Sequence, residues 1–262
     1  MPVRKSAAEV EQRRQEALRL VTGVGEVRID ELAHRLGVSV MTAHRDLDDL
    51  QSRNLLQKRR GVAAAFSTVQ RESSLRLREH VNAEFKTAIA EPLLDLVAPG
   101  DTVLIDCGST LFPFVRALSE VEQLQVVTNS LRVSYLLSES ATVTLLGDRF
   151  YPEFESCAGP EVLRQLDRFR VDVAFLTATC VHNGGLSHPV REYAENKEGF
   201  VAAAGRSVLA VDGGKFGRTA TYAHGDLSGY QTLITDDAVS RKELRAAEKC
   251  GVEVRTTVPA RA

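Results

Sequence analysis

Three short polar turns carry the residue types that bind anions through backbone amides and hydroxyl groups. They are Asp106-Cys107-Gly108-Ser109-Thr110, Thr128-Asn129-Ser130 and Asp212-Gly213-Gly214-Lys215. Small residues let backbone N–H groups approach a phosphate closely, and a helix that follows such a turn adds its dipole. Any one of these turns is also ordinary loop chemistry. What separates a ligand site from three unrelated loops is the place of the turns in the fold.

Each turn ends a short, continuous apolar run of the kind that forms a strand buried on both faces. The runs alternate with helical patterns and are TVLID (102–106), LQVVTNS (124–130), TVTLLG (142–147), VDVAFLTAT (171–179), SVLAVD (207–212) and QTLITDD (231–237). This alternation predicts the α/β fold class, with a doubly wound, mostly parallel sheet. Ligands in such sheets bind beyond the carboxyl ends of the strands. The three turns therefore predict a small anionic ligand at that edge.

A second group of residues suited to an anion lies near the amino terminus. Helical patterns cover 7–21, the stretch from Asp30 to Gly37, and a third segment for which Ser39 is the expected N-cap. The apolar stripe of the third helix consists of Val40, Ala43, Leu47 and Leu50. Two short helices joined by a glycine-containing turn describe a helix-turn-helix, with the stripe facing its core.

The outward side of the third helix and the hairpin after it are the predicted DNA contacts. The first turns of such a helix enter a major groove, and the basic run at 58–60 reads as a wing that neutralises phosphates. The predicted DNA-binding residues are Ser39, Met41, Thr42, His44, Arg45, Lys58, Arg59 and Arg60. A basic run alone is more often a solvated surface. The order of helix, helix-turn-helix and basic hairpin favours the DNA-binding interpretation.

The distribution of charge agrees with a nucleic-acid-binding amino end. Residues 1–65 hold 12 Lys and Arg against 9 Asp and Glu, whereas the rest of the chain holds 21 against 26. Only the first quarter is therefore net positive. No apolar run is long enough to span a bilayer and the amino terminus lacks a secretory signal, so we expect a cytoplasmic chain without a membrane partner. The scattered cysteines predict neither a disulfide nor a metal site, and no motif calls for a cofactor.

The patterns divide the 262 residues into two domains and a connector. We predict a winged helix-turn-helix domain over 1–66, a polar linker rich in Arg and Glu over 67–85, and an α/β ligand-sensing domain over 86–262.

The amino-terminal stretch VRIDELAHRLGVSVMTAHRDLDDLQSRNLLQKRRGVA resembles the winged helix of DeoR-type bacterial repressors. Val38-Ser39, Thr42 and Arg45-Asp46-Leu47 match the pattern Val-Ser-x-x-Thr-Ile-Arg-Arg-Asp-Leu, while Ala43 and His44 replace its Ile and first Arg. The resemblance continues through KTAIAEPLLDLVAPGDTVLIDCGSTLFPFVRAL, VVTNS, LLGD, VDVAFLTAT, ENKEGF and VDGGKFG. These segments are similar to the effector domain of the same repressors, whose fold is like that of ribose-5-phosphate and glucosamine-6-phosphate isomerases.

The resemblance implies a sugar-phosphate effector held by the first two polar turns, with Lys197 and Lys215 as cationic contacts. The expected effector-binding residues are Asp106, Gly108, Ser109, Thr110, Thr128, Asn129, Ser130, Lys197, Asp212 and Lys215. We expect a repressor of carbohydrate-metabolism genes whose operator affinity changes by linkage when the effector binds. Two DNA-binding heads must meet two half-sites, so at least a homodimer is expected.

An active enzyme of the sugar-phosphate isomerase type is the alternative. Such chemistry needs a positioned carboxylate base, and similar isomerases carry Asp-Gly-Ala-Asp-Glu after the strand corresponding to DVAF. Here that segment is Leu176-Thr177-Ala178-Thr179-Cys180. Asp106 and Asp212 remain candidate bases, although orienting a loop is the favoured role for each. His182 and His188 are interpreted as loop residues, so we expect a regulator rather than an enzyme.

Overall fold

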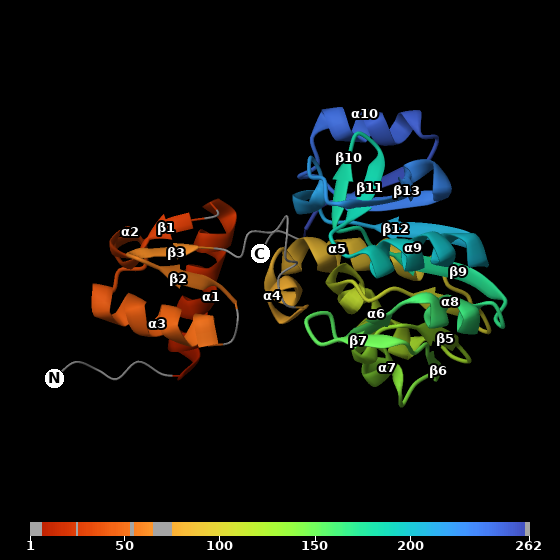
Figure 1. Ribbon diagram of the computed structural model, residues 1–262, viewed down its shortest axis with the longest axis horizontal. Coiled ribbons are helices and arrows are strands. Elements are labelled where there is room, and N and C mark those ends of the chain that lie inside the picture. The colour runs from red at the N-terminus through yellow and green to blue at the C-terminus, as the bar shows by residue number, and fades with distance from the viewer. Residues whose placement is uncertain (1–6, 25, 53–54, 65–74, 260–262) are drawn as a thin grey trace. The chain divides into compact units, whose positions relative to one another are not determined.

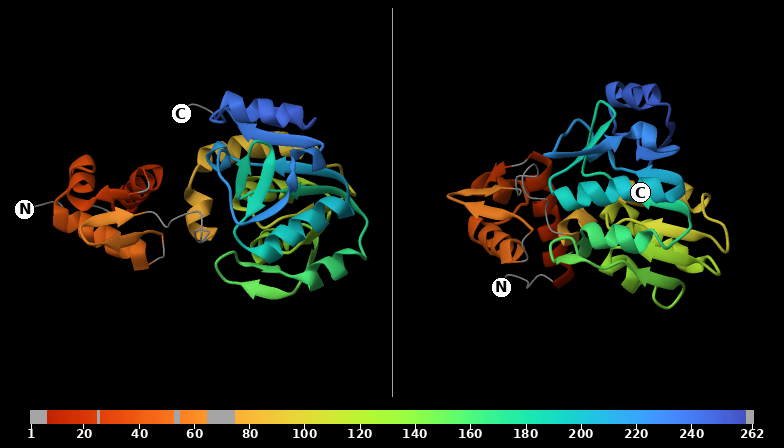
Figure 2. Two further views of the ribbon diagram at one scale, coloured as in Figure 1. Left: turned by 45° about the horizontal axis from the view of Figure 1, so that its top comes forward. Right: turned by 45° about the vertical axis from the view of Figure 1, so that its right-hand side comes forward.

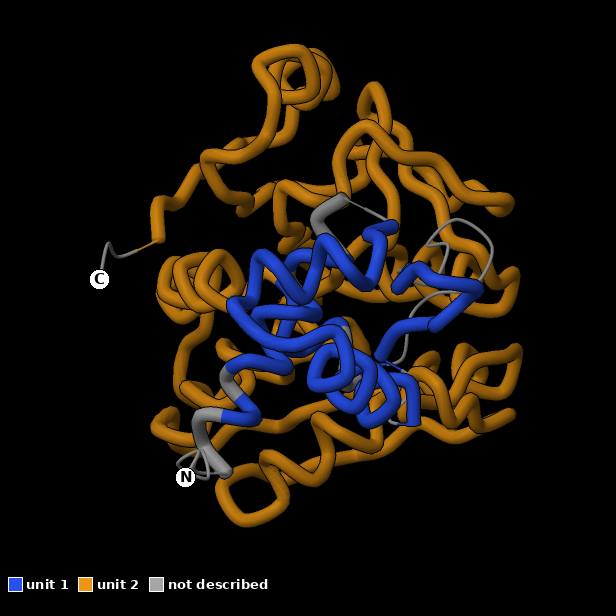
Figure 3. Tube along the Cα trace, turned by 90° about the vertical axis from the view of Figure 1, so that its left-hand side faces the viewer, with its two compact units in different colours: residues 1–81 blue, residues 82–262 orange. Residues whose placement is uncertain are grey.

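The computed structural model describes residues 7–24, 26–52, 55–64 and 75–259. The chain divides into two units, residues 1–81 and 82–262, which Figure 3 colours separately. Each unit has a hydrophobic core of its own. The expected domain limit at residue 66 lies outside the described residues, so the domain limits stay predictions.

In the first unit, helices α1, α2 and α3 pack around a small antiparallel sheet. In chain order its elements are α1 (Ala7–Val24), β1 (Glu26–Arg28), α2 (Ile29–Arg35), α3 (Val40–Ser52), β2 (Gln57–Arg59), β3 (Val62–Ala64) and α4 (Leu75–His80). Strand β3 pairs with both β1 and β2. Helices α2 and α3 form the predicted helix-turn-helix, and β2 with β3 forms the predicted hairpin (Figure 1). Helix α4 falls within the segment predicted as a linker.

The turn between α2 and α3 rests on Gly37 and Ser39. Gly37 has a φ of 63°, a conformation that costs glycine little, and it ends α2. Ser39 Oγ accepts a hydrogen bond from Thr42 N at 3.2 Å, which is the predicted N-cap of α3. Val40 is 46% exposed, so its expected place in the core stripe was wrong. The first turn of α3 projects beyond the core, and Val38, before the cap, packs against the core instead.

Within the described residues, the second unit is built on a seven-stranded parallel sheet in the order β15-β14-β12-β9-β4-β5-β6. Its strands are β4 (Thr102–Ile105), β5 (Gln125–Thr128), β6 (Thr142–Leu145), β9 (Val171–Leu176), β12 (Ala204–Ala210), β14 (Thr232–Asp236) and β15 (Glu253–Thr257). The central strands are almost wholly buried, as their continuous apolar runs predict. The α/β fold class, with an amino-terminal winged helix-turn-helix, is confirmed.

Helices cover both faces of this sheet (Figures 1 and 2). One face carries α5 (Ala83–Leu94), α6 (Phe112–Ala117) and α7 (Leu131–Leu137), and the other carries α8 (Pro160–Leu166) and α9 (Arg191–Ala203). Helix α10 (Arg241–Lys249) connects β14 to β15, and single 3-10 turns are η1 (Ser109–Leu111), η2 (Leu118–Glu120), η3 (Gly213–Lys215) and η4 (Leu227–Gly229). The chain proceeds outward from β4 in one direction and from β9 in the other. The strand order therefore reverses between β4 and β9, where such sheets bind ligands.

Two smaller sheets were not predicted from the sequence. One is the hairpin of β7 (Arg149–Tyr151) and β8 (Ser156–Ala158), and the other joins β10 (Cys180–His182), β11 (Gly185–His188) and β13 (Tyr222–Asp226). The interpretation of His182 and His188 as loop residues was wrong, because they lie on β10 and β11. Strands this short contain too few residues for an alternating pattern to be recognised.

No described helix combines the length and apolarity needed to cross a membrane. The four cysteines are free thiols. In the described parts of the chain, His, Cys, Asp and Glu side chains form no group of three suited to a metal ion.

Candidate functional sites

The amino-terminal end of α3 presents the predicted DNA-contact residues outward. Met41 is 68% exposed and Arg45 is exposed, whereas Ala43 on the other side of the helix is fully buried. Thr42 and His44 lie half-buried between these two sides. A recognition helix meets base edges through the side chains of its first turns. The geometry therefore suits DNA binding, and the role of each residue stays a prediction.

A buried ion-pair cluster holds α3 against α1. Asp46 is 2% exposed. Arg13 donates to its carboxylate through Nε at 2.6 Å and Nη2 at 3.1 Å, and Arg14 Nε donates at 3.3 Å. The hydrogen bond to Asp46 raises the pKa of Arg13. Bidentate pairing is directional, so it fixes the rotation of α3 and hence the direction of Arg45. Sequence reasoning placed Asp46 in the family pattern and missed this role.

The basic hairpin is tied to α3 by Lys58. Its Nζ forms an ion pair with Asp48, and its backbone N donates to Gln51 Oε1 at 2.7 Å. Arg59 and Arg60 are exposed. Of the three predicted wing cations, Lys58 thus has a positioning contact, and the two arginines are the ones best placed to meet phosphates.

The carboxyl ends of β4 and β9 meet around a buried carboxylate, that of Asp106. Its Oδ1 accepts from Cys107 N at 2.8 Å, and its Oδ2 accepts from the backbone N and hydroxyl of Thr177, both at 3.1 Å. Lys197 Nζ on α9 forms an ion pair with Oδ2 and donates to Thr177 O at 2.8 Å. Burial raises the pKa of Asp106, but the Lys197 ammonium and the backbone donors outweigh it and hold that pKa below its usual range. A carboxylate so fully engaged orients the loop and is poorly suited to act as a base.

The turn after β4 packs directly against β9. A Cβ added to Gly108 would lie 2.0 Å from Thr177 Oγ1, so only glycine fits there. Ser109 and Thr110 are 5% and 4% exposed. Lys86 Nζ on α5 donates to Ser109 Oγ at 3.2 Å and is itself 3% exposed. A buried cation beside a Gly-Ser-Thr turn suits a phosphate group.

Lys86 and Thr177 are residues that sequence reasoning missed. Lys86 precedes Ile89, Ala90 and Leu93 by three, four and seven positions, so it lies on the buried face of α5. A lysine on an apolar helix face is a readable signal, because such a cation is rarely buried without a partner. Thr177 offered no comparable signal, because nothing in the run Leu176–Cys180 distinguishes its hydroxyl as part of a site.

The turn after β5 is fully buried and its side chains largely hold the fold. Thr128 Oγ1 donates to Ile105 O at 2.6 Å, and Ser130 Oγ caps α7 by accepting from Val133 N at 3.2 Å. Asn129 Nδ2 donates to Cys157 O at 2.8 Å, while its Oδ1 has no hydrogen-bond partner among the described residues. Among these three expected contacts, Asn129 retains a buried side-chain oxygen that a ligand can use.

The third turn, after β12, supplies one buried carboxylate and one cation. Asp212 is 2% exposed, and its Oδ1 accepts from Asn82 Nδ2 at 2.8 Å. Its Oδ2 is buried and has no partner among the described residues. Lys215, on η3, is half-buried. Asp236 accepts from Gly213 N at 2.6 Å and so holds this turn in place. Asp212 is therefore an acceptor suited to a ligand hydroxyl.

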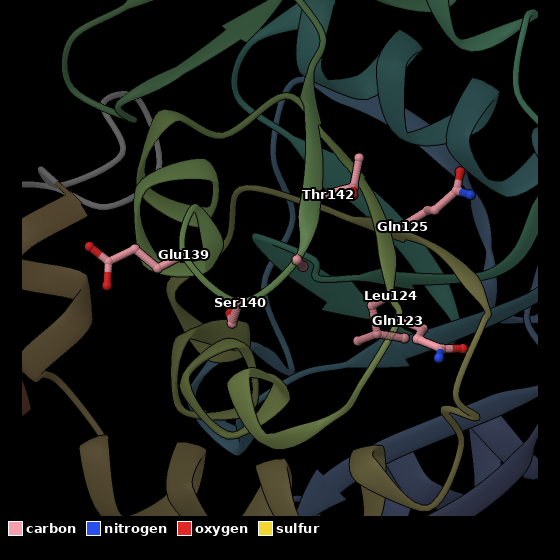
Figure 4. A pocket seen from close by; sticks show the side chains of 7 residues that line it. Gln123, Leu124, Gln125, Glu139, Ser140 and Thr142 are labelled. Atoms are coloured by element: carbon pink, nitrogen blue, oxygen red, sulfur yellow. The ribbon is translucent and has the colours of Figure 1, made fainter.

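An open pocket of about 350 Å³ lies elsewhere on this unit (Figure 4). It is lined by Gln123, Leu124, Gln125, Glu139, Ser140, Ala141 and Thr142. Gln125 and Thr142 are the first residues of β5 and β6. The pocket is therefore at the amino ends of these strands, away from the polar turns, and none of the expected site residues borders it.

Comparison with known proteins agrees with this architecture. Residues 13–69 match the family profile of the DeoR-like helix-turn-helix domain, and residues 81–237 match that of the DeoR C-terminal sensor domain. The chain is 32% identical over 240 residues to the transcriptional regulator YgbI of Escherichia coli, covering 91% of this chain and 94% of the relative. It is 30% identical over 241 residues to the regulator GlpR of Haloferax volcanii, covering 90% and 94%. The chain belongs to the DeoR family of helix-turn-helix transcriptional regulators.

Among solved structures, ribose 5-phosphate isomerase A of Methanocaldococcus jannaschii aligns with 52% of this chain and 55% of its own. The sequence identity is 21% and the TM-score is 0.38, a likeness that has no bearing on activity. The full-length relatives are named as regulators. The chain is accordingly a DNA-binding regulator with a small-molecule sensor domain, and it is not an isomerase.

Proposed function

We propose that this regulator is a repressor of carbohydrate-metabolism genes whose DNA binding is controlled by a phosphorylated sugar. The observation that supports this proposal is the cluster of buried polar residues at the switch point between β4 and β9. There the Gly108–Thr110 turn, Lys86 and the Asp106–Lys197 pair are held together by hydrogen bonds. The Lys86 cation and the backbone amides of a glycine turn favour a phosphate, and Asp212 at the neighbouring strand end favours a hydroxyl group.

The names of similar regulators support a sugar-linked role. One relative, from Haemophilus influenzae, is an L-fucose operon activator, with 28% identity over 222 residues. Another, CsqR of Escherichia coli, is named a repressor, with 29% identity over 231 residues. We favour repression because CsqR is named a repressor, and we infer that an effector preferring one arrangement of a homodimer weakens operator binding by linkage. This activity belongs in the cytoplasm, where operator DNA and phosphorylated sugars meet.

The test combines ligand binding and DNA binding on the full chain. Thermal-shift screening with phosphorylated sugars identifies a binder by mass action, and a gel-shift titration at fixed salt then measures its effect on the operator complex. Ser109→Asp places a negative charge in the phosphate turn, so the effector response is lost while DNA binding is kept. Ser119→Asp, at an exposed serine on η2, is the matched control and retains the response. A response that survives Ser109→Asp contradicts the proposed phosphate turn.

A further inference from the structure

Two buried polar side chains, His224 and Tyr230, lack a hydrogen-bond partner within the described part of the chain. His224 lies on β13 and is 3% exposed, and neither of its ring nitrogens has a partner among the described residues. Tyr230 lies between η4 and β14 and is 4% exposed. Its hydroxyl also has no hydrogen-bond partner among the described residues. Nearly all buried polar atoms in proteins are hydrogen-bonded, because leaving such an atom without a partner is unfavourable. These three atoms therefore point to an occupant.

Both residues lie near α9, the helix that carries Lys197 of the effector site. Strand β13 packs against α9, the helix that carries Lys197. Burial, followed by the charge of Lys197, lowers the pKa of His224 to about 3. Burial and the carboxylate of Asp106 raise the pKa of Tyr230. Strand β13 carries His224, and Tyr230 belongs to the hydrophobic core that includes Phe200 of α9, so both residues lie near the helix that carries Lys197.

The chemistry of this region suits an uncharged hydroxyl group. A neutral imidazole offers one donor and one acceptor, and a phenol offers the same. The Lys197 ammonium has three protons, of which Asp106 and Thr177 accept two. The Asp106–Lys197 pair is neutral as a whole, and His224 stays uncharged at physiological pH because its pKa is so low. A phosphate dianion gains little in such a place, whereas a hydroxyl both donates and accepts.

We propose that His224 and Tyr230 form a second subsite of the effector site, which binds the hydroxyl-bearing end of a polyhydroxy phosphate ester. The phosphate lies at the Gly108–Thr110 turn beside Lys86, and the sugar hydroxyls extend past Lys197 to the two side chains. The assignment of this subsite rests on the proposed function, to which it adds a basis for ligand specificity. It selects ligands by the hydroxyl pattern at the end opposite the phosphate.

The experiment separates the two ends of the ligand. Inorganic phosphate, glycerol 3-phosphate, ribose 5-phosphate, glucose 6-phosphate and fructose 1-phosphate are titrated calorimetrically into the full-length wild type. They are also titrated into Tyr230→Phe and His224→Leu. Tyr222→Phe removes a hydroxyl from a partly exposed tyrosine of β13 and is the matched control. Tyr230→Phe removes no hydrogen bond seen within the described protein, so it leaves the fold intact.

The expected result is a selective loss of affinity. For the sugar phosphate that binds best, Tyr230→Phe and His224→Leu each weaken binding about threefold to tenfold, the value of one lost hydrogen bond. Inorganic phosphate binds all four proteins equally. Equal affinity of the wild type and both variants for that sugar phosphate overturns the subsite, as when only structural water occupies it, and leaves the proposed function standing. If no phosphorylated sugar binds the wild type, the proposed function itself fails.

Discussion

The recognition surface of α3 and the strand-end site of the second unit differ in what the fold requires of their residues. Met41 and Arg45 stand exposed and support no core contact, so their identities can change without loss of stability. Asp106, Lys197 and Lys86 are all at least 95% buried, and each has a hydrogen-bond partner on another element. Binding and folding are therefore separable in the first region and coupled in the second.

The difference predicts how each region responds to substitution. A charge on the protein surface costs little to remove, whereas breaking a buried ion pair leaves its partner uncompensated. Changes at the exposed positions Met41 and Arg45 of α3 should alter DNA affinity alone. Changes at the strand ends should alter stability together with the effector response.

The largest effect is expected for Lys197→Met. It leaves the Asp106 carboxylate buried without its cation, which costs about 3–5 kcal/mol of unfolding free energy. Chemical denaturation of the full chain measures this loss. Adding Asp106→Asn to Lys197→Met removes the buried charge and should restore part of the stability. If Lys197→Met unfolds at the wild-type denaturant concentration, the coupling of folding and binding at this site is refuted.

Acidification should destabilise the second unit through His224. Its pKa is about 3 in the folded protein against the ordinary histidine value of 6.5, so the unfolded chain binds an extra proton between these values. Stability therefore falls as the pH is lowered from 6.5 toward 3, by about 1.4 kcal/mol for each pKa unit of difference. In His224→Leu this slope should be reduced in urea denaturation curves measured across that range. Asp106, whose pKa is lowered from 3.8, adds a loss only below that value. An unchanged slope in His224→Leu excludes a neutral, buried His224.

Arg45→Ala should remove most operator affinity and leave stability unchanged. A base-contacting arginine contributes about 1–3 kcal/mol, equivalent to a loss of roughly fivefold to more than a hundredfold in affinity. Gel-shift titration at fixed salt gives the affinity and thermal unfolding gives the control. Arg164→Ala, an exposed arginine on α8, is the matched change and keeps full affinity. Undiminished binding by Arg45→Ala would rule out α3 as the recognition helix.

The smallest effect is expected in the wing. The double variant Arg59→Ala, Arg60→Ala should weaken binding to all DNA sequences alike and reduce the slope of log affinity against log salt by about 1 for each phosphate that is no longer neutralised. Fluorescence anisotropy over a salt series measures this slope. A loss confined to the operator sequence would instead assign these arginines to base contacts.

Much of the fold was predictable because its signals are local in the chain. Ser39 caps α3 and Gly37 ends α2, as their residue types indicate. Val40 fits the stripe by spacing and is nevertheless exposed, because periodicity does not say how far a helix extends beyond its core. Strands β9 and β12 were recognisable from the apolar runs at 171–179 and 207–212, although β12 begins earlier, at Ala204. Strands β10, β11 and β13 were not, since β10 and β11 are too short to show a clear pattern and β13 pairs with β11 from a distant part of the chain.

The candidate site was predicted as three turns, and the structure changed the roles that we assign to several of their residues. The hydroxyls of Thr128 and Ser130 made these residues candidates for ligand binding, but both hydroxyls form hydrogen bonds with backbone groups. Lys86 and Thr177 join Ser109 and Asp106 through contacts that span 23 and 71 residues of the chain. His224 lies far from these residues in the sequence. What indicates a role for it is its burial without a hydrogen-bond partner among the described residues.

The order of residue types along the chain determined two things about this protein: a capped, amphipathic helix with cations beside it, and buried strands that end in small polar residues. Both follow from interactions among near neighbours, which hydrogen bonding and periodicity make readable. Tertiary structure decided which polar groups face a ligand and which only satisfy the backbone. That choice depends on strand order and helix packing, because they bring together side chains from α5, the turn after β4, α9 and β13, which lie far apart in the sequence.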